Sequence, residues 1–186
     1  MQKLIDDNYI KIEYHYKGNG GKCRALNYAF ELVENDTFLL IVDSDDILLS
    51  DGVSKVKRSV EKFNKENIGA IFFLYELTNG KRILGSKNEL NTTIVSDRYE
   101  YNRLYGQHDG CIGYYSRAIK KYKYPEFEGE TYVGPTVIQL AMSREFSIVF
   151  TPKVVGIAEY QPNGLTKKGR KLRFNNPKGM ICYGRL

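Results

Sequence analysis

The sequence predicts one α/β domain, a sheet flanked by helices. Short apolar runs with strand character, such as residues 37–46 and 68–77, alternate with segments in which apolar residues recur every three or four positions. Strands that alternate with helices form a sheet covered by helices. The chain of 186 residues, 42% of them apolar, is long enough for one such core.

The N-terminal half supplies most of these elements. Alternating apolar residues predict a strand over 10–16, and helical spacing predicts helices over 21–35 and 51–67. Residues 68–77, "IGAIFFLYEL", predict a strong strand. The expected inward residues of the two helices are Ala25, Leu26, Ala29, Leu32 and Val33 in the first, and Val53, Val56, Val60 and Phe63 in the second.

The C-terminal half is less regular. Residues 81–105 are mixed and polar, and "TNGKR" predicts a turn between Leu77 and Ile83. A short helix is expected at 116–122 and a loop leading into a helix at 126–146. Residues 147–160 predict two β segments that are broken at Pro152.

Charge is uneven along the chain. The net charge is +6, and residues 161–186 hold seven Lys or Arg and no acid. This basic tail is either a solvated surface or a site for phosphates or an anionic membrane surface. We expect no nucleic-acid partner, because neither zinc-finger spacing nor an RNP-type aromatic pattern accompanies the charge.

Cysteine spacing and hydropathy bound the location of the protein. Cys23, Cys111 and Cys182 are far apart and form no CxxC pair, so we expect reduced thiols and no zinc site. No apolar stretch approaches the length of a membrane span, and the first ten residues contain acids where a signal peptide is apolar. We therefore expect a cytoplasmic protein, with peripheral contact at the inner face of the membrane as an alternative.

Three carboxylates end the apolar run in "FLLIVDSDDILL". Ligands of open α/β sheets bind at the carboxyl ends of strands, and Asp43, Asp45 and Asp46 lie at such an end. Their oxygens suit Mg²⁺ or Mn²⁺, which can stabilise a departing diphosphate. A helix N-cap or an Asx turn is the structural alternative. An EF-hand is excluded, because its next ligand positions are Ile47 and Leu49.

A glycine-rich turn precedes the first predicted helix. In "GNGGKCRALN", residues 18–27, backbone N–H groups and Lys22 could face a phosphate. The segment is not a P-loop, because Cys23 follows Lys22 and the glycine spacing differs. An ordinary loop-to-helix turn remains the alternative.

Four blocks follow one another along the chain: "NGGKCRALNYAFE", "FLLIVDSDDILLSDGV", "EFEGETYVGPTVIQLAM" and "AEYQPNGLTKKGRKLRFNNPKGM". In this order they resemble the family 2 glycosyltransferases of bacterial capsule and surface-polysaccharide clusters. The resemblance implies the GT-A fold, a Rossmann-like mixed sheet that binds nucleotide-diphospho-sugars. It also implies that Asp43 contacts the donor nucleoside and that Asp45, with Asp46, holds Mn²⁺ or Mg²⁺ in a DXD motif. The donor side would be lined by Asn19, Gly21, Lys22 and Asn27.

The resemblance also implies the acceptor side. Asp109, in "QHDG", falls where the family commonly has an Asp beside the acceptor. Many relatives have a carboxylate in the stretch occupied here by Gly134 and Pro135, so Glu130, or else Glu128, is the expected base. Basic groups such as Arg170 and Arg173 would close over the diphosphate.

Family members normally begin with two further βα units, so by this resemblance the chain is expected to be one domain that is incomplete at its N-terminus. Residues 1–95 would form the donor and metal half, and residues 96–186 the acceptor half with a basic lid. The implied activity is inverting transfer from a nucleotide-sugar, a UDP-sugar, to a hydroxyl of a glycan or lipid-linked acceptor. The alternatives are an inactive fragment or binding module and, from the DxD pattern alone, a metal-dependent phosphotransferase.

Overall fold

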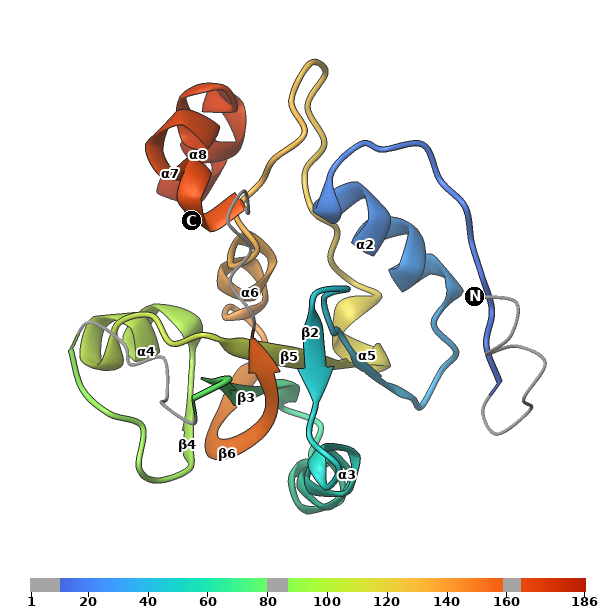
Figure 1. Cartoon of the computed structure of the whole chain (residues 1–186), viewed down its shortest axis with the longest axis vertical. Helices are drawn as coiled ribbons and strands as arrows, with labels where there is room; N and C mark the ends of the chain where they lie inside the picture. Colours follow the sequence, from blue (N-terminus) through green and yellow to red (C-terminus); the bar gives the residue numbers. More distant parts are fainter. Residues whose placement is uncertain (1–10, 80–86, 159–164) are drawn as a thin grey trace.

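A six-stranded mixed sheet forms the centre of the computed structural model, which describes residues 11–79, 87–158 and 165–186 (Figure 1). The strand order is β1-β5-β3-β6-β2, and β4 also pairs with β6. β3 runs parallel to β6, and the other pairs are antiparallel. The strands are β1 (Phe38–Leu40), β2 (Asp46–Leu48), β3 (Ile68–Leu77), β4 (Ile94–Ser96), β5 (Gly110–Tyr115) and β6 (Ser147–Ala158).

Helices cover the two faces of the sheet unequally. One core contains residues of four helices together with Ala70, Phe72 and Leu74 of β3. The other core contains α3 and the opposite side of β3, and it is the smaller of the two. The helices are α2 (Lys22–Leu32), α3 (Gly52–Phe63), α4 (Arg98–Tyr105), α5 (Ser116–Ile119), α6 (Val137–Met142), α7 (Leu165–Phe174) and α8 (Pro177–Arg185), of which α2, α4, α5 and α6 line the first core.

The centre of the sheet confirms the strongest prediction. β3 has the predicted bounds, and its first eight residues are buried. It lies between β5 and β6 in the sheet, and alternate side chains of its two faces pack into the two cores. A continuous apolar run suits a strand that is covered on both faces.

Two predictions for the N-terminal region are wrong. Residues 11–20 form no regular secondary structure, and Tyr14 and Tyr16 are 62% and 84% exposed. Alternation in the sequence produced no strand there, because no described strand pairs with this segment. The helix α2 is confirmed, but its buried residues are Cys23, Asn27 and Phe30. The expected inward residue Leu32 is 48% exposed.

The predicted break at Pro152 is an irregularity inside one strand. β6 continues through the proline, and its pairing with β3 shifts from Phe73↔Thr151 to Leu74↔Val154. Proline has no N–H to donate to a ladder, so it is accommodated where the register slips. The first part of β6 then pairs with β4 and the last part with β2.

The region after β3 contains elements that the sequence did not indicate. β4, α4 and β5 all lie between residues 94 and 115. Asp97 is the N-cap of α4, and its Oδ1 accepts a hydrogen bond from the Glu100 N–H at 2.8 Å. The expected turn at "TNGKR" falls mostly on residues outside the described part of the chain. No helix in the described ranges is long and apolar enough to cross a membrane.

Candidate functional site

The three carboxylates of "DSDD" lie on a tight turn between β1 and β2. The N–H of Asp46 donates to the carbonyl oxygen of Asp43 at 3.1 Å, which closes the turn. Just before it, Ile41 still pairs with Ile112 of β5, and just after it, Asp46 pairs with Ala158 of β6. Residues 43–46, which we call the acidic turn, are thus fixed by the sheet on both sides.

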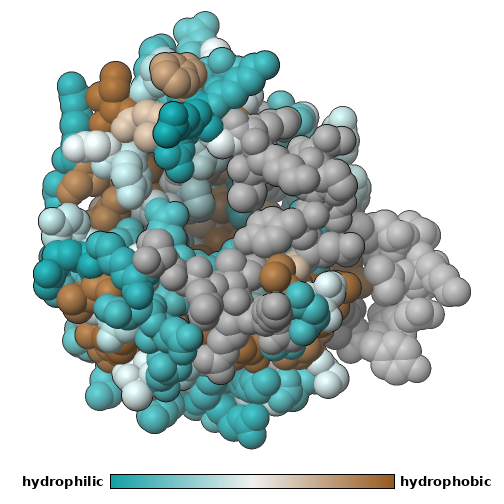
Figure 2. All heavy atoms as spheres, turned by 60° about the vertical axis from the view of Figure 1, so that its left-hand side comes forward, coloured by the Kyte–Doolittle hydropathy of each residue, from teal (hydrophilic) through white to brown (hydrophobic). Residues whose placement is uncertain are grey.

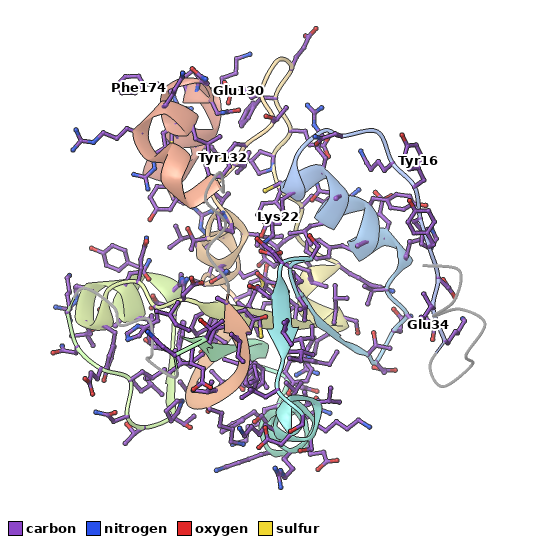
Figure 3. The ribbon with its side chains drawn as sticks, viewed as in Figure 1. Tyr16, Lys22, Glu34, Glu130, Tyr132 and Phe174 are labelled. Atoms are coloured by element: carbon purple, nitrogen blue, oxygen red, sulfur yellow. The ribbon has the colours of Figure 1, made fainter. Side chains whose placement is uncertain are left out.

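A lysine at the start of α2 faces this turn. Lys22 Nζ lies 2.5 Å from Asp43 Oδ2, and both side chains are about two-fifths exposed. Figure 3 shows Lys22 between α2 and the turn that leads into β2. The glycine-rich segment therefore places a cation beside the acidic turn. Asn19 supports this segment, because its Oδ1 accepts the Gly21 N–H at 3.1 Å.

Gly21 is required by the geometry of this turn. Its φ is +89°, a conformation that favours glycine, and a Cβ atom there would lie 1.9 Å from the carbonyl oxygen of Thr131. The next helical turn makes a second contact with the same loop, because Cys23 Sγ donates to the Val133 carbonyl at 3.2 Å. The start of α2 is therefore packed directly against residues 131–133.

A fourth carboxylate comes from the start of β5. The Asp109 carbonyl accepts the Tyr75 N–H, which places Asp109 at the carboxyl end of β3. Its negative charge acts on Asp46. The pKa of Asp46 is raised to about 6, and the largest cause is the partial burial of its carboxyl group. The neighbouring carboxylates contribute to the same rise, and Lys22 opposes it. We call Asp43, Asp45, Asp46 and Asp109 together the acidic cluster.

Two buried groups that the sequence analysis did not select lie close to this cluster. Burial raises the pKa of the Cys111 thiol to about 11, and it raises the pKa of the Tyr75 hydroxyl as well. The negative charges of Asp46 and Asp43 act in the same direction on both groups. Both side chains therefore remain neutral near the carboxylates. In the sequence, both residues look like ordinary members of an apolar strand. Their position near the carboxylates is visible only in the fold.

The acidic cluster suits a divalent cation by chemistry. It gathers hard oxygen donors, and their mutual repulsion is reduced when a cation binds. In the part of the chain that the structure describes, no three acidic, His or Cys side chains converge on one point that could hold a metal. The carboxylates fit a metal in charge and atom type, and Asp45 is exposed while Asp46 is partly buried. They do not form a closed coordination shell by themselves.

Glu130, the expected base, is engaged at a helix start. Its side chain is buried, and its two oxygens accept the N–H groups of Lys178 and Gly179, each at 2.9 Å. These are N–H groups of the first turn of α8, which have no partner within the helix. In Figure 3 Glu130 lies beside the α7–α8 pair and away from Lys22. The structure thus gives Glu130 a capping role.

Asn27, expected on the donor side, is also used internally. It is 6% exposed, and its amide exchanges two hydrogen bonds with the backbone of Tyr124. Its Nδ2 also donates to Glu126 at 2.8 Å. These contacts join α2 to the start of the loop that follows α5, so we assign Asn27 to holding that loop.

The remaining expected residues lie on the surface. Glu128 is exposed in the loop between α5 and α6. Arg170 and Arg173 are exposed on α7, after a kink at Gly169. Arg173 is near Tyr132, because its charge lowers the pKa of the Tyr132 hydroxyl against the stronger effect of burial. The structure therefore brings the acidic cluster, Lys22 and Gly21 together, and leaves Glu128, Arg170 and Arg173 exposed on the surface.

A mixed α/β sheet flanked by helices is the architecture of the GT-A class of transferases, and its acidic cluster lies at strand ends, where ligands of such sheets bind. The family model described as "Glycosyl transferase family 2" matches residues 1–123, about two-thirds of the chain. The chain belongs to this family and is a glycosyltransferase, and enzymes of this family typically use a divalent metal. The match includes the whole acidic cluster and ends before Glu130. No curated protein matches the chain.

Proposed function

We propose that this enzyme transfers a sugar, with inversion, from a UDP-sugar to a hydroxyl group of a glycan or lipid-linked acceptor during synthesis of a cell-surface polysaccharide. The observation that carries the proposal is the acidic cluster beside Lys22, at the strand ends where ligands of such sheets bind. The family supports a nucleotide-sugar donor. The choice of UDP and of a surface polysaccharide follows the resemblance of the sequence blocks.

The residues divide into three roles. Asp45 and Asp46 would hold the cation, which supplies positive charge to the leaving diphosphate when it is bound. Lys22 is already next to Asp43, and the N–H groups at the start of α2 also favour an anion. Asp43 would contact the nucleoside.

In the transfer, the acceptor oxygen bonds to the anomeric carbon, the bond to the diphosphate breaks, and a base takes the hydroxyl proton.

We assign the base to Asp109. It belongs to the acidic cluster but not to the turn that would hold the metal. Glu130 is a weaker candidate, because both of its oxygens are occupied by N–H groups of α8. A base must lie within hydrogen-bond reach of the reacting hydroxyl, and Glu130 is buried at the start of α8.

Calorimetric titration of UDP with and without Mn²⁺ tests the metal assignment. Asp45→Asn should weaken Mn²⁺-dependent UDP binding roughly tenfold or more, because a charged oxygen contact to the metal is lost. Stability should change little, since Asp45 is exposed. Glu61→Gln, an exposed carboxylate of α3, is the matched control and should bind as the parent does. Equal UDP affinity in the Asp45 variant and the parent would refute the metal site.

A further inference from the structure

The C-terminal helix pair, α7 and α8, presents cations and apolar side chains together to solvent. Phe174 is 81% exposed, Ile181 54% and Leu186 45%. Figure 3 shows Phe174 at the outer end of the pair. In Figure 2 apolar residues lie among hydrophilic ones at the top of the molecule, where this pair is located. The outer surface of the pair consists of Arg173, Phe174, Lys178, Ile181, Arg185 and Leu186.

The exposed residues of α8 form one stripe. Lys178, Ile181 and Arg185 are separated by three and four positions, so they share one side of the helix. All three are exposed, whereas Gly179 is buried and Tyr183 packs against the first core. The exposed side of α8 therefore combines one apolar side chain with two cations.

The inner side of the pair is already used for attachment to the body. Glu130 accepts the first N–H groups of α8, and Asn176, between the two helices, accepts the N–H groups of Thr131 and Tyr132 at 2.9 and 3.0 Å. The Asn176 side chain also donates to the Leu172 carbonyl. These contacts attach the pair through its inner side. The outer surface stays exposed and can contact another partner.

We propose that this outer surface binds an anionic lipid membrane. The surface carries Arg173, Lys178 and Arg185, within a segment 161–186 that contains no acid, and these cations complement the negative charge of phospholipid headgroups. Exposed Phe, Ile and Leu side chains can enter the boundary between headgroups and acyl chains, as in helices that lie in a membrane interface. A second copy of the same surface is disfavoured, because two clusters of cations repel each other. Membrane binding would place the enzyme next to a lipid-linked acceptor.

Nucleic acid fits this surface less well. Phosphates would pair with the cations, but the aliphatic side chains of Ile181 and Leu186 have no role in such a complex. The apolar residues therefore distinguish the two partners. Loss of Phe174 should weaken membrane binding, whereas it should leave a purely electrostatic interaction with a polyanion nearly unchanged.

Sedimentation with phosphatidylcholine–phosphatidylglycerol vesicles tests the proposal. The full chain should bind these vesicles and not pure phosphatidylcholine vesicles, and added NaCl should weaken the binding. Phe174→Ser should reduce partitioning roughly tenfold, because an apolar side chain is no longer buried. The Lys178→Gln and Arg185→Gln double variant should reduce it by roughly tenfold as well.

Matched controls lie on other parts of the molecule. Tyr99→Ser removes an aromatic side chain that is 69% exposed on α4, and the Lys57→Gln and Arg58→Gln pair removes two exposed charges of α3. Both should bind vesicles as the parent does. The proposal is overturned if the anionic vesicles do not bind the chain, if controls and test variants lose binding equally, or if Phe174→Ser binds like the parent. The surface would instead be a general polyanion site if a single-stranded oligonucleotide displaced the vesicles completely and Phe174→Ser did not change vesicle binding.

Discussion

Two carboxylates that the sequence predicts on the acceptor side, Glu130 as the base and Asp109 beside the acceptor, have different surroundings. Glu130 is 8% exposed and accepts two N–H groups at the start of α8, where the helix dipole also favours a negative charge. Asp109 lies at a strand end with other carboxylates, and its charge raises the pKa of Asp46. In the first environment both oxygens accept helix N–H groups, and the carboxylate stabilises the start of α8. In the second environment Asp109 lies among carboxylates at the strand ends, where the proposed substrate would bind.

These surroundings predict opposite results for two amide substitutions. Asp109→Asn should lower kcat by roughly 100-fold or more, because the proton acceptor is lost, and leave thermal stability nearly unchanged. Glu130→Gln should lower the free energy of unfolding by about 1–3 kcal/mol, because an amide NH₂ cannot accept the second N–H. Transferase assays and denaturant unfolding measure the two effects. A large loss of kcat for a Glu130→Gln protein of parental stability would return the base to Glu130.

Residue roles could be predicted where they depended on local pattern, and not where they depended on distant partners. The acidic turn was visible because its carboxylates directly follow an apolar run. Asn27 bonds to the backbone of Tyr124, 97 positions away, and Glu130 bonds to Gly179, 49 positions away. No local spacing encodes such pairs, so both residues were expected to bind substrate or catalyse.

At the scale of single elements, the start of α2 depends on one glycine. Gly21 combines a positive φ with a backbone contact to Thr131 that leaves no room for a side chain. Lys22 follows directly, so the direction in which its amine points depends on the same turn. The glycine-rich segment therefore serves packing first, and the position of the cation follows from it.

Gly21→Ala should be strongly destabilising and Gly18→Ala should not. The first change forces a left-handed conformation on alanine and a clash with the Thr131 carbonyl, so we expect a loss of at least about 2 kcal/mol. No atom lies within 4 Å of a Cβ at Gly18, which makes it the matched control. Thermal unfolding of the two variants measures the difference. Equal stability would show that the loop at 131 can move away freely.

Elements were predictable in proportion to their length and pattern. β3 and α3 were predicted because a long apolar run and a regular helical spacing each favour one structure. The alternation over 10–16 was misleading, because a strand also needs a neighbour to pair with. β4 has three residues, and β5 contains Gly110 and Gly113, so neither gives a strong strand pattern. Gly113 is packed against the ring of Phe38, a requirement that only the assembled sheet reveals.

At the scale of the whole molecule, one loop joins the first and last helices. The segment between α5 and α6 rises between α2 and the C-terminal pair in Figure 1. On one side it contacts Gly21 and Cys23, and on the other side it contacts Asn176 and the start of α8. The two ends of the described chain are therefore attached through residues 130–133.

Asn176→Ala should detach the C-terminal helix pair from this loop. Three hydrogen bonds of a 4% exposed side chain are lost, which corresponds to about 1–3 kcal/mol. Hydrogen exchange of residues 170–186 should accelerate, while β3 and β6 keep the protection of the parent. Asn175→Ala, an exposed neighbour, is the control. If exchange accelerates uniformly over the chain, the contact supports the entire fold and not the attachment of the pair.

The pairing of β2 with the last residues of β6 also has a consequence for the order of folding. Residues 46–48 cannot pair until residues 156–158 have been synthesised and have reached the sheet. Closing so long a loop costs entropy that local contacts do not repay, whereas the β3–β5 pairing joins nearer parts of the chain. The carboxylates of residues 43–46 thus leave the ribosome early but are fixed in place late. Because β6 also pairs with β3 and β4, this turn is completed together with the centre of the sheet.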